Sequence, residues 1–279
     1  MTDATREFFH HETCMGTVFR FGGQTPFDPA TTKQLVMSAC EILHEADRNF
    51  SLYKPESPLS RLARGEAAVR DLPSVVSDIW DTCEAWEKIT DGWFSAFTPE
   101  HTFDPSGIVK TWAAAAAAHY LVEHGLNDIT LNAGGDVLIS DAATGADDWR
   151  IGLHKPVSIA SAEAGALAVI DLKGTAFRAV ATSGSAERGS HIWNPKAPER
   201  AAADELVQVS VVARDLVTAD VWATAAFAMG NRAIDLLNRY NEANPDKAVE
   251  ALAISNRLDP STGEPQLDAT EGFSSLFAK

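Results

Sequence analysis

ATSGSAERGSHIWNP at residues 181–195 and TADVWATAA at residues 218–226 are the two segments that say most about the fold and chemistry of this chain. The first predicts a strand that runs into a loop of small residues and reaches His191. The second predicts the first turns of a helix, with Thr218 as its N-cap. The rest of the chain is interpreted outward from these segments.

Asp220 and Thr224 are a candidate metal site because residues four positions apart share one face of a helix. A carboxylate and a hydroxyl suit zinc poorly, since zinc prefers nitrogen and sulfur ligands. They suit a hard cation such as Mg²⁺, whose coordination is completed by water, carbonyl or phosphate oxygens. The alternative is structural: Asp220 stabilised by the helix dipole and Thr224 bonded to a backbone carbonyl.

Composition limits the classes of function. With 279 residues, of which 45% are hydrophobic and 22% charged, the chain suits one large domain over residues 1–279 or two intimate subdomains. The net charge of −16 argues against a nucleic-acid partner, and a phosphate-rich ligand would need a local cation. The three cysteines lack metal-ligand spacing, so we expect small buried residues in a reducing compartment.

The start of the chain carries no apolar segment typical of an export signal, and no apolar run reaches the ~18 residues that span a bilayer. We therefore expect a soluble, cytoplasmic protein with no membrane span.

Periodicity and turn residues predict an α+β fold rather than a regular βαβ series. We expect the first strand at Met15–Phe21 and an irregular tail after Asp259. The predicted helices cover residues 31–50, 73–91, 111–124, 218–229 and 231–244. The other predicted strands cover residues 129–133, 137–140, 149–153, 166–171, 177–182, 206–213 and 251–255.

Two further segments carry candidate ligand contacts. Gly134-Gly135 allows a plain hairpin turn or a close approach of the backbone to a ligand. Residues 103–110 predict a turn that leads into a helix, and a helix start beside Lys110 suits an anion. Lys110 as a solvated surface lysine is the alternative.

Taken in order, these segments resemble the ApbE family, the FAD:protein FMN transferases, over residues 14–255. The matching segments are MGT at 15–17, SLYKPESPLSRL at 51–62, DPSGIVK at 104–110, NAGGD at 132–136, WRIGLHKP at 149–156, ATSG at 181–184 with Glu187, Arg188 and His191, and Ala219-Asp220 with Thr224.

The resemblance implies an α+β fold with a mixed β-sheet core, flanking helices and an FAD cleft between subdomains. It implies a flavoprotein transferase that binds Mg²⁺ and FAD, moves FMN onto a Thr or Ser hydroxyl of an acceptor protein, and releases AMP. Two alternatives stay open: an FAD pyrophosphatase giving FMN and AMP, and a non-catalytic FAD-binding protein. The presence of His191, Asp220 and Thr224 together favours the two enzymes.

The resemblance also implies roles for single residues. His191 is the candidate base and, with Asp220, a catalytic residue. The implied metal ligands are Asp220, Thr224 and a backbone carbonyl at Gly107. The implied FAD-binding residues are Met15, Gly16, Thr17, Tyr53, Asp104, Lys110, Asp136, Thr182, Ser183 and His191. For Tyr53, a place at the edge of the core is an equally good reading.

The chain departs from the family pattern in two places. Thr111 stands where relatives usually have Gly after the lysine. After His191, relatives usually read Ile-Ile-Asp-Pro-x-Thr-Gly, whereas this chain has Asn194 for the Asp and lacks the Thr-Gly. We expect the second change to affect acceptor choice or transfer efficiency.

Overall fold

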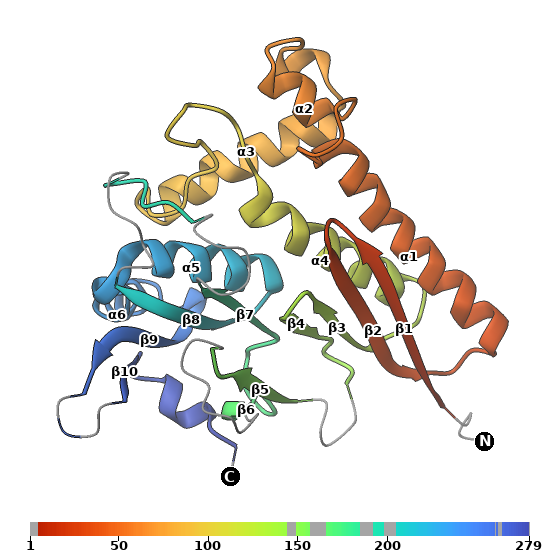
Figure 1. Cartoon of the computed structure of the whole chain (residues 1–279). Helices are drawn as coiled ribbons and strands as arrows, with labels where there is room; N and C mark the ends of the chain where they lie inside the picture. The colour runs from red at the N-terminus through yellow and green to blue at the C-terminus, as the bar shows by residue number, and fades with distance from the viewer. Residues whose placement is uncertain are drawn as a thin grey trace. The chain divides into compact units, whose positions relative to one another are not determined.

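In the computed structural model, the chain forms two compact units (Figure 1). Unit 1 comprises residues 1–88 and 95–148, and unit 2 comprises residues 89–94 and 149–279. The structure describes residues 5–143, 149–156, 166–184, 192–197, 205–259, 261 and 264–278.

Unit 1 contains four strands that pair in chain order, each antiparallel to the next. They are β1 (Arg6–Cys14), β2 (Thr17–Thr25), β3 (Asp128–Ala133) and β4 (Asp136–Ile139). The helices are α1 (Pro29–Phe50), α2 (Pro58–Ala63), α3 (Ser74–Ile89, whose last residue belongs to unit 2) and α4 (Ser106–Glu123), with a 3₁₀ turn η1 (Val69–Asp71). Helix α1 packs on β1 and α4, and α4 packs on β3.

The core of unit 1 follows from residue size and periodicity. Phe19 and Phe21 alternate with exposed Arg20 on β2, and both phenylalanines are fully buried. The alanines of α4 at positions 113, 114, 117 and 118 are buried, so small side chains let this helix pack closely against its neighbours. The dense alanine run therefore has a packing role.

Unit 2 contains four more strands that pair in chain order, again antiparallel. They are β7 (Ala179–Gly184), β8 (Leu206–Ala213), β9 (Glu250–Leu258) and β10 (Pro265–Ala269), with a separate antiparallel pair of β5 (Arg150–His154) and β6 (Ala166–Asp171). Helix α5 (Leu216–Met229) packs on β7 and β8, and α6 (Ala233–Ala243) packs on β9 and α5. Short 3₁₀ turns are η3 (Gly230–Arg232), η4 (Pro245–Lys247) and η5 (Phe273–Leu276).

The predicted α+β class is confirmed, and most predicted elements are found close to their expected bounds. The prediction of a first strand at 15–21 is wrong at its start, because Met15 and Gly16 form a turn and β1 precedes it. Strand β1 was missed because its alternation carries polar residues such as His10 and Glu12 on its inner side. Likewise β10 and η5 lie within the tail that was expected to be irregular.

Two helix starts also differ from the prediction. Helix α4 begins at Ser106 rather than Thr111, so Lys110 lies on the helix and not in a turn before it. The N-cap of α5 is Asp215 and not Thr218. Asp215 Oδ1 accepts from the Thr218 N–H at 2.8 Å, and its Oδ2 accepts from the Thr218 hydroxyl at 2.7 Å, which is the contact an N-cap makes with the third helical residue.

All three cysteines are buried free thiols, as their composition predicted. In the part of the chain that the structure describes, no helix combines the length and apolar character needed to cross a membrane.

Candidate functional site

Two tight turns of unit 1 carry predicted ligand contacts. Met15 and Gly16 join β1 to β2 with φ of 49° and 69°, as in a type I′ hairpin turn. Gly134 and Gly135 join β3 to β4 with φ of 65° and 111°. The Gly134 N–H donates to the Val18 carbonyl at 3.2 Å, so the two turns lie side by side. A non-glycine residue with positive φ, such as Met15, is uncommon and marks a backbone held by its surroundings.

We predict that Gly134→Ala destabilises the protein by about 2–4 kcal/mol. An added Cβ would lie 2.3 Å from Thr17 Oγ1 and 3.3 Å from Thr17 Cβ, and φ is already +65°. Gly65→Ala is the matched control, because its φ is +71° and its Cβ would meet open space. The control should show only the backbone cost of about 1–2 kcal/mol. Urea unfolding measures both, and equal losses would show that the contact with Thr17 adds nothing.

Lys110 and Asp136 form a shielded ion pair in unit 1. Lys110 Nζ lies 2.5 Å from Asp136 Oδ2, and the side chains are 19% and 3% exposed. The reading of Lys110 as a solvated surface lysine is therefore wrong. Both residues were predicted to contact the cofactor, and the structure shows that they contact each other. Asp136 fixes the direction of the ammonium group and offsets its charge.

The start of α4 presents backbone N–H groups. Asp104 Oδ1 accepts from the Ser106 N–H at 3.0 Å, and the Asp104 N–H donates to the Ala96 carbonyl at 2.8 Å. Gly107 lies in this first turn, where N–H groups lack intrahelical partners and suit an anion. Thr111 is fully buried, and its hydroxyl donates to the Ile108 carbonyl at 3.2 Å, so the helix accommodates this departure from the family pattern.

Tyr53 is 98% exposed, on the loop between α1 and α2. Its reading as a residue at the edge of the core is therefore wrong. The loop itself is organised by serines: the Ser51 carbonyl accepts from the hydroxyls of Ser57 at 2.6 Å and Ser60 at 3.0 Å.

In unit 2, Asp220 and Thr224 share one face of α5, and Ser183 lies beside Thr224. Asp220 is only 6% exposed, on a helix whose residues are nearly all buried. Thr224, one turn later, has its Oγ1 3.5 Å from Ser183 Oγ on β7. A carboxylate and hydroxyl groups are oxygen ligands of the kind that Mg²⁺ prefers. The residues present therefore fit a hard cation.

Thr182 and Ser183 were predicted together, but they point to opposite faces of β7 because strand side chains alternate. Thr182 pairs across the sheet with Ser210 on β8, with 2.8 Å between the hydroxyl oxygens. Ser210 was not predicted. Its signal was available, since Gln208 and Ser210 are the only polar residues in LVQVSVVA at 206–213.

His191, with Glu187 and Arg188, lies outside the described residues, so the predicted base stays a prediction. Beyond it, Asn194 Oδ1 accepts from the N–H groups of Lys196 and Ala197, each at 3.0 Å. An Asp at this position could accept the same two hydrogen bonds, so the Asn in this chain preserves the hydrogen bonding of the turn.

Comparison with known proteins gives a consistent result. The sequence model described as ApbE family matches residues 96–245. Two curated relatives are both named FAD:protein FMN transferase. The one from Klebsiella pneumoniae (strain 342) is 29% identical over 60% of this chain and 50% of its own length. The one from Vibrio cholerae serotype O1 (strain ATCC 39541 / Classical Ogawa 395 / O395) is 30% identical over 47% of this chain and 40% of its own length. The chain spans about half the length of the curated relatives it matches.

Solved structures share the fold. Flavin Transferase ApbE from Vibrio cholerae has a TM-score of 0.77 at 20% identity, covering 98% of this chain and 100% of that one. The apo form of Pseudomonas stutzeri flavinyl transferase ApbE has a TM-score of 0.76 at 16% identity, with 98% and 97% covered. The ApbE protein of Thermotoga maritima has a TM-score of 0.74 at 20% identity, with 98% and 100% covered.

Proposed function

The chain belongs to the ApbE family, and from this premise we propose that it transfers FMN from FAD to a Thr or Ser hydroxyl of an acceptor protein in a Mg²⁺-dependent reaction. The names of the two curated relatives support flavin transfer. The structural observation that carries the proposal is the buried Asp220 carboxylate one turn before Thr224, whose hydroxyl contacts Ser183.

The proposed reaction exchanges one bond at phosphorus. The acceptor hydroxyl oxygen forms a phosphoester bond with the phosphorus of the FMN half of FAD. The bond from that phosphorus to the oxygen bridging the two phosphates breaks, and AMP leaves with this oxygen. The proton of the hydroxyl passes to a base, for which His191 is our candidate because the unperturbed pKa of histidine lies near neutral pH.

Asp220 and Thr224 would hold the Mg²⁺ ion. When bound, the ion supplies positive charge that neutralises phosphate oxygens. The protein contributes a carboxylate already withdrawn from solvent on a packed helix, so little reorganisation is needed to place it. The Ser183 hydroxyl on β7 lies 3.5 Å from the Thr224 hydroxyl. The Gly107 carbonyl as a further ligand stays a prediction.

Unit 1 is proposed to contribute flavin and phosphate contacts. Lys110 would contact a phosphate oxygen, while Asp136 keeps its ammonium group in one orientation. This supplies the local cation that a chain of net charge −16 needs for a pyrophosphate ligand. Met15, Gly16 and Thr17 would contact the cofactor through a turn whose backbone is already fixed. Tyr53, fully exposed, is free to stack on a ring of the ligand.

The test is to incubate the purified chain with FAD and an extract of the cells it comes from, with and without Mg²⁺. We expect a Mg²⁺-dependent fluorescent band that survives denaturing electrophoresis, together with AMP. Mass spectrometry of that band should find one FMN moiety on a Thr or Ser. Steady release of FMN and AMP with no labelled protein would instead show an FAD pyrophosphatase. FAD binding without AMP under any metal condition would show a non-catalytic binding protein, and either result would overturn the proposal.

A further inference from the structure

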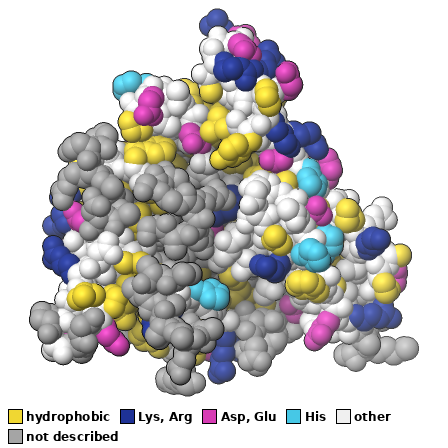
Figure 2. Space-filling view, in the orientation of Figure 1, with side chains coloured by type: hydrophobic (Ala, Val, Ile, Leu, Met, Phe, Trp, Pro, Cys, Tyr) yellow, Lys and Arg dark blue, Asp and Glu magenta, His cyan; other side chains and the backbone are white. Residues whose placement is uncertain are grey.

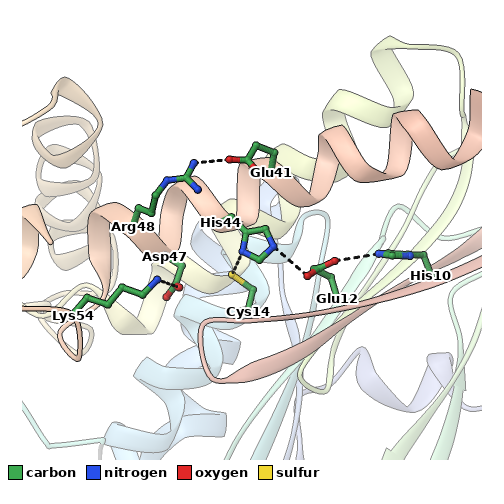
Figure 3. Close-up of polar contacts among 8 residues, drawn as sticks. All are labelled: His10, Glu12, Cys14, Glu41, His44, Asp47, Arg48 and Lys54. Carbon is green, nitrogen blue, oxygen red and sulfur yellow. Dashed lines mark hydrogen bonds and ion pairs between the residues drawn. The ribbon is translucent and has the colours of Figure 1, made fainter. Parts of the chain in front are cut away.

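A second group of metal-ligating side chains lies in unit 1, between β1 and α1. Strand alternation puts His10, Glu12 and Cys14 on the side of β1 that faces α1. Helix α1 presents Cys40 and His44, which lie four positions apart and so share one face. Figure 3 shows His44 reaching from the helix to the strand between Cys14 and Glu12.

The polar atoms of this group form a connected chain. His10 Nε2 lies 3.3 Å from Glu12 Oε2, and His44 Nε2 lies 3.1 Å from Glu12 Oε1 (Figure 3). The other ring nitrogen of His44, Nδ1, lies 3.5 Å from Cys14 Sγ. Glu12 is thus held by an imidazole on each carboxylate oxygen, and His44 is held at both ring nitrogens.

The ligand atoms of His10, Glu12 and Cys40 all lie within 4.8 Å of one another. An imidazole nitrogen, a carboxylate oxygen and a sulfur are together the donor set of zinc rather than of Mg²⁺. Two ligands in a tetrahedral shell with bonds of about 2.0–2.2 Å lie roughly 3.3–3.6 Å apart. The distance of 3.3 Å between His10 Nε2 and Glu12 Oε2 falls in this range, and the Cys40 sulfur lies within 4.8 Å of a ligand atom of each residue.

The group is sealed on one side and open on the other. Cys40 is 1% exposed, whereas the side chains of His10 and Glu12 are 31% and 20% exposed. Figure 2 shows histidine side chains gathered on the face where β1, β2 and α1 lie. His10 also lines a cavity of about 320 Å³. The partly exposed side chains of His10 and Glu12 therefore leave the group open to solvent.

The group offers a cation the carboxylate of Glu12 and the sulfur of Cys40. Zinc binds the thiolate form of cysteine, so binding at Cys40 would release the thiol proton to solvent.

We propose that unit 1 binds a zinc ion through His10 Nε2, the Glu12 carboxylate and Cys40 Sγ. His44 is a positioning residue that holds Glu12 through its second oxygen, and Cys14 in turn fixes the His44 ring. The site joins a strand to a helix, so the bound ion ties β1 to α1. It shares no residue with the Asp220–Thr224 pair and does not depend on the proposed flavin chemistry.

The test uses the full chain stripped with a chelator and titrated with Co²⁺, followed by absorbance, and then with Zn²⁺. The Asp220→Ala variant is titrated in parallel to remove binding at the Mg²⁺ ligands. We expect one equivalent of Co²⁺ to give a thiolate-to-cobalt charge-transfer band that Zn²⁺ abolishes. Cys40→Ser should lack the band, and His10→Asn and Glu12→Gln should weaken binding by on the order of a hundredfold or more. His44→Ala should weaken it by about 10–100-fold, as for a residue that orients a ligand.

Two matched control variants test whether loss of the band is specific to the proposed ligands and not a general effect of changing a histidine or a cysteine. His11→Asn changes the neighbouring histidine on the exposed face of the same strand, and Cys83→Ser changes a buried cysteine on α3. Both should keep the band. Absence of the band in the unaltered chain, its persistence in Cys40→Ser, or undiminished binding in His10→Asn would overturn the proposal. If circular dichroism shows that Cys40→Ser fails to fold, the partly exposed His10→Asn carries the test, through loss of the zinc-induced rise in Tm.

Discussion

Replacing Asp220 with alanine should slow FMN transfer about thousandfold, which corresponds to about 4 kcal/mol of transition-state stabilisation. Asp220 is the one charged residue proposed to hold the Mg²⁺ ion, and it is 6% exposed, so solvent screens it little. The effect on folding should be small beside this loss. Alanine is the best helix former, and the substitution removes the cost of burying a carboxylate.

The measurement is the rate of AMP release at limiting and at saturating Mg²⁺, with urea unfolding of the same samples. Asp220→Asn should behave like the alanine variant, because it keeps the shape and removes the charge. Asp215→Asn is the matched control: it changes an exposed aspartate on the same helix and keeps a good N-cap, so it should keep full activity. Full turnover of Asp220→Ala at limiting Mg²⁺ would refute the metal assignment.

Replacing Lys110 with methionine should destabilise the protein by about 3 kcal/mol or more. The substitution leaves the 3%-exposed Asp136 side chain without the ammonium group that lies 2.5 Å away. Breaking one side of a buried ion pair typically costs about 3–5 kcal/mol, because the remaining charge stays buried. The double variant Lys110→Met with Asp136→Asn should recover most of this loss, since it removes both charges together.

A double-mutant cycle measured by urea unfolding tests this coupling. The matched control is Lys54→Met, because Lys54 also lies 2.5 Å from an aspartate, Asp47, but is 51% exposed. That exposed pair should contribute about 0–1 kcal/mol. Equal losses at Lys54 and Lys110, or no recovery in the double variant, would show that burial does not set the strength of the Lys110–Asp136 pair.

The sequence predicted well those helices and strands whose pattern of apolar residues lies within the element itself. The apolar stripe of α1 includes Ala39, Leu43 and Phe50, all buried, and the predicted helix differs from the observed one only at its start. Strand β8 is β-branched and apolar apart from Gln208 and Ser210, and every residue in it is buried. Strand β1 was not predicted, because histidine, glutamate and cysteine on its inner face interrupt the alternation of apolar and polar residues that identifies a strand.

The candidate site also contains some contacts that the sequence could predict and others that depend on packing. Asp220 and Thr224 could be paired in advance because helical periodicity alone places them on one face. Lys110 and Asp136 were each predicted, but not as partners, since their contact depends on how α4 packs beside the turn between β3 and β4. From the sequence, the spacing of Cys40 could be compared only with that of the other cysteines. Its proximity to His10 and Glu12 depends on how β1 packs on α1.

Strand β1 has a further consequence for the behaviour of the whole molecule. It is the outermost of the four described strands of unit 1, so one of its sides faces no neighbouring strand within that sheet (Figure 1). Such an edge can template pairing with another chain, and charged or polar side chains discourage this association. The charged and polar residues of β1, among them Arg6, Glu7, His11 and Glu12, therefore discourage association through this edge. A sequence with a stronger apolar alternation here would be easier to recognise as a strand and more prone to associate through this edge.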